Sequence, residues 1–388
     1  MDTTQQNEAN AFFDKRTPWS KVKHEVLSRY LDVYVSKVGS YEDHLFFVDG
    51  FAGCGIYDDG NVGSPLIAAM KSSRPLTHTS AGKLRCIFVE EDTSNAAALE
   101  KALMDNFPNV QTTILPGKFD AVLPDILKQI GKAPTFFFID PFGFQSIDLE
   151  LLRKIKANTS CKSEVLLRFD DIYLKRMGSF AATHSQNVHA PSVKKAAQTF
   201  AIKCSAVLGV DWSNASDSCR EDIVASYCDL IKQEGLYKFA ISYPVKNPET
   251  GGHHYYLVHF CNFEDGYIHM ADFMGQIERS IEHKNPELFP TLDQEPSFGV
   301  IVDAAVREQD KAVEKQNIDQ ILAFFRSQPG TRWRKMHLLK RRHFCAAAVD
   351  QFGYRIRLKE AQRALTAWLT ETGGQSNGTK ESSPVTLR

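Results

Sequence analysis

The stretch FFVDGFAGCG, residues 46–55, leads from an apolar run into Asp49 and then into a turn that holds Gly50, Gly53 and Gly55. Glycine has no side chain and tolerates a positive φ, so a turn of this kind lets the backbone approach a ligand closely. A tight strand-to-helix connection without a ligand is the alternative. The stretch predicts a buried strand that ends in a candidate ligand loop.

Length and composition are those of an ordinary globular protein. A chain of 388 residues exceeds what one core usually fills, which favours two domains or one large domain with an appendage. The net charge of −1 means that a basic surface for nucleic acid has to be local. No apolar run is long enough to cross a bilayer, and the polar start MDTTQQNEAN lacks a signal-peptide pattern. We expect a cytoplasmic protein without membrane contact.

Short apolar runs alternate with helical patterns through the first two thirds of the chain. This alternation predicts right-handed crossovers and a mostly parallel, doubly wound α/β sheet. A helical pattern at 17–38 precedes the first strand, and an antiparallel strand is expected at 253–260. The parallel strands are expected at residues 44–51, 83–92, 110–119, 133–143 and 163–170.

Acidic residues follow these strands where ligands collect in doubly wound sheets, at the carboxyl ends. Glu90 is the first acid after the second strand and is placed to bind both hydroxyls of a ribose, with Glu91 as the second candidate. A solvated helix N-terminus is the alternative reading of these acids. The loop matches neither the phosphate-binding G-x-x-x-x-G-K-[ST] pattern nor G-x-G-x-x-G, which favours a cofactor with a ribose and no phosphates, such as S-adenosylmethionine.

Three segments together resemble a known family. PWSKVKHEVLSRYL, FVDGFAGCGIYDDGNVGSPLIAA and FFFIDPFGF are similar to segments of the bacterial three-Cys-motif partner (TcmP) proteins, within the S-adenosylmethionine-dependent methyltransferase superfamily. The resemblance spans about residues 12–275 and implies a Rossmann-like methyltransferase domain. It also implies a possible partner, a radical-enzyme-like protein that carries the three cysteines.

The resemblance assigns cofactor contacts by position. Asp49 would receive the amino group of S-adenosylmethionine, and Glu90 or Glu91 would hold its ribose. Asp120 would lie near the adenine amine, although a helix cap is an alternative role for this residue. The other residues implied to border the cofactor are Phe51, Ala52, Gly53, Gly55, Lys118 and Phe119.

The tetrapeptide DPFG at 140–143 carries the implied catalytic residues. It resembles the acid-proline-aromatic segment of methyltransferases that act on exocyclic base amines. Asp140 would accept a hydrogen bond from the amine, the Pro141 carbonyl would assist, and Phe142 or Phe144 would stack on the base. A strand-end turn with Phe142 in the core is the alternative. Such a transfer needs no metal, so the histidines at 253 and 254 have no required role, and we expect no metal site.

Two further parts of the chain lie outside this pattern. The insert at 170–235 is expected to form a lid or a substrate-binding element, with disorder at 178–192 as the alternative. The stretch 331–363 carries a local charge of about +8, which fits a basic helical or winged-helix-like module that binds DNA or RNA. A helical cap with a solvated basic surface is the alternative. Candidate nucleic-acid contacts are Phe144, Arg168, Arg332, Arg334, Lys335, Lys340, Arg341 and Arg342.

The expected domain order is a helical segment at 1–40, the methyltransferase-like domain at 41–275, a linker at 276–300, the basic module at 301–374 and a disordered tail at 375–388. Three functions remain open. The first is transfer of a methyl group to an exocyclic base amine of nucleic acid. The second is a non-catalytic, nucleotide-binding partner protein of a bacterial or phage modification or defence system. The third is methylation of a small molecule or a protein.

Overall fold

The computed structural model describes residues 18–57, 60–73, 84–141, 149–184, 191–209, 220–247, 250–282, 304–328, 340–376, 378 and 382–386. The chain forms two compact units, which divide between Asn262 and Phe263. Each unit is described by itself.

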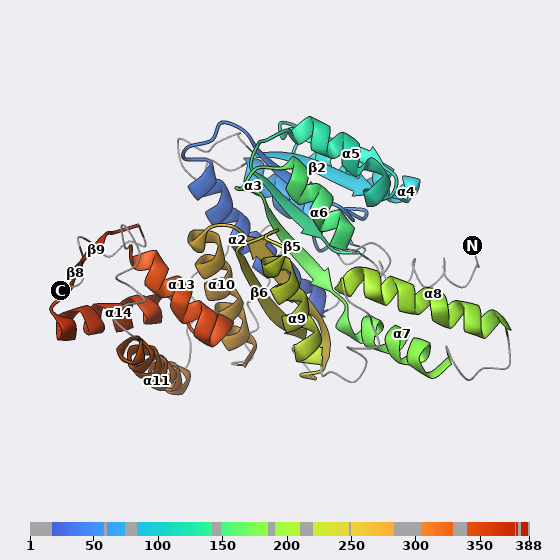
Figure 1. Ribbon diagram of the computed structural model, residues 1–388. Helices are drawn as coiled ribbons and strands as arrows, with labels where there is room; N and C mark the ends of the chain where they lie inside the picture. Colours follow the sequence, from blue (N-terminus) through green and yellow to red (C-terminus); the bar gives the residue numbers. More distant parts are fainter. Residues whose placement is uncertain are drawn as a thin grey trace. The chain divides into compact units, whose positions relative to one another are not determined.

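The first unit contains a seven-stranded sheet with the order β3-β2-β1-β4-β5-β7-β6 (Figure 1). Strand β7 is antiparallel to both of its neighbours, and the other pairs are parallel. The strand order reverses between β1 and β4, which therefore flank the switch point of a doubly wound sheet. The α/β prediction is confirmed. The strands are β1 (Leu45–Asp49), β2 (Leu84–Glu90), β3 (Thr112–Pro116), β4 (Thr135–Ile139), β5 (Glu164–Phe169), β6 (Phe239–Lys246) and β7 (His253–Cys261).

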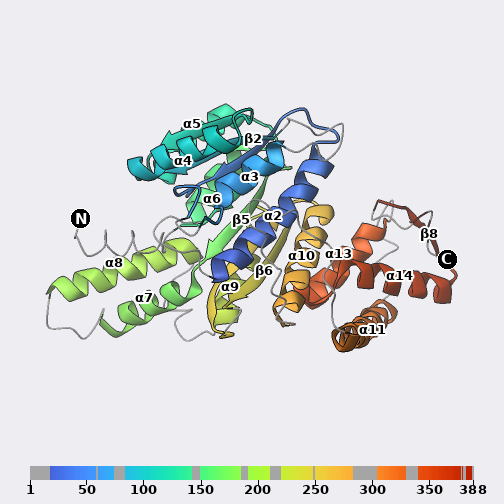
Figure 2. The same ribbon diagram turned by 180° about the vertical axis from the view of Figure 1, so that it is seen from behind.

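Helices cover both faces of this sheet. Figure 1 shows α5 and α6 in front of the sheet, and Figure 2 shows α2 and α3 on the opposite face. Helices α7, α8 and α9 follow β5, within the segment expected to be an insert. The helices are α2 (Pro18–Val38), α3 (Ser64–Ser73), α4 (Thr93–Asn106), α5 (Phe119–Ile130), α6 (Leu149–Asn158), α7 (Asp171–His184), α8 (Pro191–Leu208) and α9 (Arg220–Gln233).

Alternating side chains of the central strands pack against the two helix layers, because successive residues of a strand point to opposite faces. Val48 of β1 belongs to the same buried cluster as Leu123 and Ile126 of α5. On the other face, the ring of Phe136 in β4 lies 5.4 Å from that of Tyr30 in α2. Strands covered on both faces read as continuous apolar runs, which is why the sequence revealed them.

The second unit is mainly helical. It contains α10 (Glu264–Glu282), α11 (Ala304–Ser327), α13 (Arg341–Phe352), the 3₁₀ helix η2 (Gly353–Arg355), α14 (Leu358–Thr372), β8 (Gln375–Ser376) and β9 (Val385–Thr386). Gly275 lets α10 approach η2 closely, since a Cβ there would lie 2.3 Å from the carbonyl oxygen of Tyr354. Because α10 packs with this unit, the division falls at 262 rather than near 275, and 276–282 is helix rather than linker.

The described end of the chain contains ordered contacts where the composition suggested disorder. Strands β8 and β9 pair in an antiparallel ladder, and Lys340 forms a bridge with Pro384. The Arg341 amide also donates to the Ser383 carbonyl at 3.0 Å. Backbone pairing of this kind does not depend on apolar side chains, so composition alone gave no sign of it. Among the described residues, no helix is long and apolar enough to span a membrane.

Candidate active site at the carboxyl edge of the sheet

The glycine turn after β1 adopts the backbone that its residues suggested. Gly53 and Gly55 have φ values of 67° and 83°, which L side chains adopt only with strain. The Gly50 amide donates to the Phe138 carbonyl of β4, and the Ala52 amide donates to the Val89 carbonyl of β2. The turn is therefore tied to the ends of both strands that neighbour β1.

Asp49, the last residue of β1, is fully buried. Its Oδ1 accepts a hydrogen bond from the Phe51 amide at 3.0 Å, whereas Oδ2 has no hydrogen-bond partner among the described residues. Burial raises the pKa of Asp49 to about 7, against the opposing effect of hydrogen bonds from Ser64 and the Phe51 backbone. An oxygen buried without a donor is costly, and a cationic or N–H group of a ligand would satisfy it.

The two acids after β2 occupy different environments. Glu90 reaches the glycine turn, where its Oε2 accepts from the Gly53 amide at 2.7 Å and its Oε1 from the Asp92 amide at 2.9 Å. Each carboxylate oxygen retains a lone pair for a further donor. Glu91 instead lies exposed, with Lys118 3.7 Å away. The structure brings Glu90 to the candidate ligand loop and leaves Glu91 on the surface.

The residues assigned to an adenine lie after β3 at the start of α5. Phe119 is buried, and its ring lies 5.9 Å from that of Phe51, whereas the side chains of Lys118 and Asp120 are exposed. Lys118 occupies the N-cap position of α5, so Asp120 lies in the first turn and is not the helix cap. The Phe119 ring packs against the glycine turn, since a Cβ on Gly50 would meet this ring at 3.0 Å.

Asp140 follows β4 and is held between two cations. Lys23 of α2 pairs with its Oδ2, and Nη1 of Arg168 lies 3.7 Å from its Oδ1. The side chain of Asp140 is 13% exposed, and Oδ1 has no hydrogen-bond partner among the described residues. Pro141 is buried. Phe142 and Phe144, predicted to stack on a base, lie outside the described residues.

Asp49 is the last residue of β1 and Asp140 follows the neighbouring strand β4, so both lie at the carboxyl edge beside the switch point. The charge of Asp140 contributes to raising the pKa of Asp49, and the charge of Lys23 opposes it. The edge thus presents two buried carboxylate oxygens, Asp49 Oδ2 and Asp140 Oδ1, without a hydrogen-bond donor in the described part of the chain.

Sequence reasoning missed the contribution of α2 to this edge. Lys23 is 5% exposed and lies four residues after Trp19 and four before the buried Leu27. Lysine is rarely buried, so a lysine in the apolar stripe of a helix is a signal that could have identified Lys23 as a site residue. Trp19 lies here too, with its ring stacked 3.9 Å from that of His254.

The two adjacent histidines at the start of β7 have contacts within the protein. His253 Nε2 lies 2.8 Å from Oδ1 of the buried Asp171. The pKa of His254 is lowered by burial and by the neighbouring His253. Among the described residues, no group of three His, Cys, Asp or Glu side chains is arranged to hold a metal ion.

The residues of the second unit predicted to contact nucleic acid differ in exposure and in their partners. Arg341 is 3% exposed and donates to the Gln362 carbonyl at 2.8 Å, so it holds α13 against α14 rather than facing solvent. Arg342 lies 3.8 Å from Glu264 and 3.7 Å from Asp265. Lys340 lies at the start of α13 and is partly exposed. Arg332, Arg334 and Lys335 lie outside the described residues.

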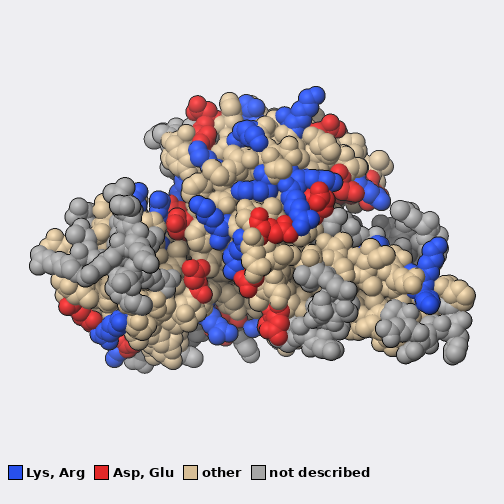
Figure 3. Space-filling model, in the orientation of Figure 1, with Lys and Arg blue, Asp and Glu red and all other residues tan. Residues whose placement is uncertain are grey.

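Other basic side chains in this stretch also have acidic partners. Glu314 of α11 pairs with both Lys359 and Arg363 of α14, and Arg357 lies 3.3 Å from Asp272. On the face drawn in Figure 3, basic and acidic side chains are intermixed. The local excess of positive charge is thus partly neutralised by acids distant in sequence.

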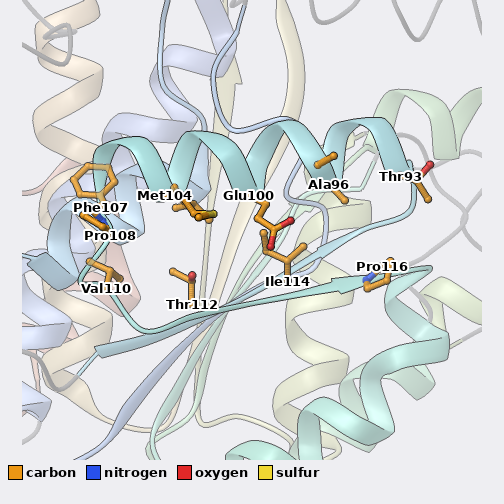
Figure 4. A pocket seen from close by; sticks show the side chains of 12 residues that line it. Thr93, Ala96, Glu100, Met104, Phe107, Pro108, Val110, Thr112, Ile114 and Pro116 are labelled. Carbon is orange, nitrogen blue, oxygen red and sulfur yellow. The ribbon is translucent and has the colours of Figure 1, made fainter.

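A hollow lies between α4 and β3, away from the switch point (Figure 4). Its lining is mostly apolar and includes Met104, Phe107 and Ile114, with Glu100 as its ionisable side chain. None of the residues of the glycine turn, nor Asp140, lines it. We assign this hollow no role at the carboxyl edge.

No protein-family model matches the sequence, and no curated protein sequence matches it. Among solved structures, a Legionella pneumophila protein is 12% identical, with a TM-score of 0.36 over 63% of this chain and 85% of that chain. The plantazolicin methyltransferase BpumL in complex with SAH is 8% identical, with a TM-score of 0.35 over 68% and 91%. An O-methyltransferase from Bacillus cereus in complex with SAH is 13% identical, with a TM-score of 0.37 over 68% and 92%. This chain is distantly similar to each of them.

Proposed function

We propose that the protein is an S-adenosylmethionine-dependent methyltransferase whose acceptor is an exocyclic amine of a nucleic-acid base. The observation that carries the proposal is the pair of buried carboxylate oxygens, Asp49 Oδ2 and Asp140 Oδ1, at the switch point of the sheet. Both lack a donor among the described residues, and both are placed where doubly wound sheets bind ligands. A cofactor with an ammonium group and an acceptor with an N–H group would supply the two donors.

The residues after β1 and β2 fit this cofactor. Asp49 Oδ2 would accept from its ammonium group, and the remaining lone pairs of Glu90 would accept from its ribose hydroxyls. Gly53 has no side chain that could obstruct the bound molecule, and its positive φ suits glycine. When bound, S-adenosylmethionine supplies a methyl group activated by its sulfonium.

Asp140 is assigned to bind the amine that accepts the methyl group. Its Oδ1 would accept an N–H of the amine and so direct the nitrogen lone pair toward the methyl carbon. Methyl transfer would form a new N–C bond as the C–S bond breaks with its electrons left on sulfur, and the nitrogen would release a proton to solvent. We assign stacking on the base to Phe142 or Phe144. A base within a duplex has to be flipped out to reach this edge.

The second unit is proposed to bind the nucleic acid. Along the chain, α11 is followed by Lys340, which bridges to Pro384, and then by α13, α14 and the hairpin of β8 and β9. This succession of helices and short strands supports the proposal of a winged-helix-like module. Since Arg342, Lys359 and Arg363 have acidic partners, we assign the phosphate contacts to the segment 331–340.

The test is transfer of a tritiated methyl group from S-adenosylmethionine to total transfer RNA and to a mixed-sequence DNA duplex. Asp140→Ala is expected to reduce the rate about 100-fold while calorimetry shows unchanged cofactor affinity. Asp125→Ala, which removes an exposed acid from α5, is the control and should retain the full rate. Absence of transfer to either nucleic acid by folded, cofactor-binding protein would contradict the proposal.

A second candidate function is a non-catalytic partner protein that binds the nucleotide-like ligand without turnover. The pairing of Asp140 with both Lys23 and Arg168 favours it, because a carboxylate engaged by cations is a weaker acceptor for an amine. Cofactor binding without methyl transfer, together with a stable complex with a three-Cys-motif protein, would support this candidate.

A further inference from the structure

Helix α2 brings one basic side chain into the carboxyl edge from a segment that precedes the sheet. Lys23 is 5% exposed, its ammonium group pairs with Asp140 Oδ2, and it lies 5.8 Å from the centre of the Phe138 ring. The same end of α2 is anchored at β7, where the Tyr255 hydroxyl donates to the Trp19 carbonyl at 3.2 Å. Its place is therefore fixed by packing on β4 and β7.

Burial of this lysine is costly for the fold. Burial lowers the pKa of Lys23 and Arg168 lowers it further, whereas Asp140 opposes both effects. Apolar side chains of similar size often replace a buried ion pair without loss of stability. Packing of α2 alone therefore does not require a charged group at position 23.

The two carboxylate oxygens of Asp140 differ in their hydrogen bonding. Oδ2 is occupied by Lys23, whereas Oδ1 has no hydrogen-bond partner among the described residues. Arg168 makes no hydrogen bond to Oδ1; its guanidinium lies over the Tyr255 ring at 4.6 Å, and its Nη2 approaches Asp170 at 3.4 Å. At 3.7 Å from Oδ1, Arg168 adds charge without occupying the hydrogen-bonding position.

We propose that Lys23 is a positioning residue that fixes Asp140 through Oδ2, so that Oδ1 is directed at an N–H donor of the methyl acceptor. The proposal deepens the proposed function and rests on it. It also specifies the acceptor class, since a fixed carboxylate oxygen accepts from a neutral amine and repels an acceptor that reacts as an oxyanion or a thiolate.

The test compares Lys23→Met with Lys23→Arg in the full-length chain. The assay measures the single-turnover rate with tritiated S-adenosylmethionine and the nucleic acid that the wild type methylates. Lys23→Met is expected to reduce the rate about 100-fold, because Asp140 loses its fixed orientation. The cofactor dissociation constant is measured at about pH 8.5, where Asp49 is ionised without the help of the Lys23 charge, and should stay within about twofold there. Lys23→Arg is expected to restore a substantial part of the rate.

Lys71→Met is the matched control. Lys71 of α3 is also buried and also pairs with a carboxylate, Asp32 of α2, at 2.7 Å. Its loss should affect the docking of α2 in a similar way and leave the rate of the folded enzyme unchanged. An unchanged rate in Lys23→Met, or an equal fall in Lys71→Met, would overturn the positioning role.

Failure of the proposed function gives a different result. If the wild type binds S-adenosylmethionine and methylates no nucleic acid, the function fails whatever Lys23 does, and the positioning role fails with it. The contact itself is then judged by a double-mutant cycle of Lys23→Met and Asp140→Asn in urea unfolding. Additive effects would mean that the pair does not fix Asp140, and a coupling would support the fixed carboxylate in a binding role.

Discussion

The ammonium group of Lys23 pairs with the carboxylate of Asp140 across 117 residues of sequence. The pair joins the helix that precedes the sheet to the end of β4, beside the glycine turn. It connects the architecture of the first unit to the candidate chemistry, because it occupies one oxygen of Asp140 and leaves the other without a hydrogen-bond donor in the described part of the chain.

Gly55→Ala should destabilise the first unit and weaken binding of S-adenosylmethionine. The new Cβ would lie 2.7 Å from both Leu66 Cδ1 and Leu99 Cδ1, at a φ of 83°. We expect a loss of about 1–3 kcal/mol in the free energy of urea unfolding. Gly60→Ala is the control, since its φ of 79° is similar but no atom lies within 4 Å of the added Cβ. Equal losses would show that backbone strain alone, and not the close packing of the turn, sets the effect.

Affinity for S-adenosylmethionine should rise with pH between about 5.5 and 7. In the free protein the pKa of Asp49 is about 7, so the carboxyl is largely protonated below that value. Binding an ammonium group favours the ionised form, so the proton is released and the dissociation constant falls about tenfold per pH unit below 7. Calorimetry across this range measures the slope. Asp49→Asn should bind S-adenosylmethionine weakly, with an affinity that does not change with pH. A wild-type affinity that does not change with pH would contradict the assignment of Asp49 to the ammonium group.

Glu90→Gln should weaken cofactor binding more than Glu91→Gln. A glutamine offers one oxygen, so it cannot accept from both the Gly53 and the Asp92 amides, and one amide then faces an NH₂ group. We expect about a tenfold higher dissociation constant for Glu90→Gln. The exposed pair of Glu91 and Lys118 contributes little, so Glu91→Gln should stay within about twofold. Equal effects would leave Glu90 without its assigned role.

Arg341→Met should destabilise the second unit, whereas Arg342→Met should not. Nη2 of Arg341 donates to the Gln362 carbonyl and to Thr366 Oγ1, both on α14. Losing these bonds costs about 1–3 kcal/mol, measured by urea unfolding of the full chain. The pairs of Arg342 with Glu264 and Asp265 are longer and partly exposed, so about 0–1 kcal/mol is expected. If Arg341→Met is stable and binds nucleic acid more weakly, Arg341 is instead a nucleic-acid contact, as predicted from sequence.

The sequence predicted the sheet well because the periodicity of buried strands is a local property. The strands Leu45–Asp49 and Thr135–Ile139 are buried throughout and are apolar except for Asp49 and Thr135, which is typical of strands covered on both faces. The positive φ of Gly55 and the position of Glu90 at the carboxyl end of β2 also follow from local sequence. Local patterns could not show that the basic residues of 331–363 meet acids such as Glu314, because those partners are distant along the chain.

By itself, the sequence determined the doubly wound sheet, its glycine turn and the acids at its carboxyl edge, since each depends on residues next to one another in the chain. Only the tertiary structure decided which oxygens of those acids lack donors, and that Lys23 holds Asp140 while Glu91 faces solvent. The physical reason is that burial and pairing depend on which elements pack together. Here α2 packs on the sheet beside β4, more than a hundred residues away in sequence.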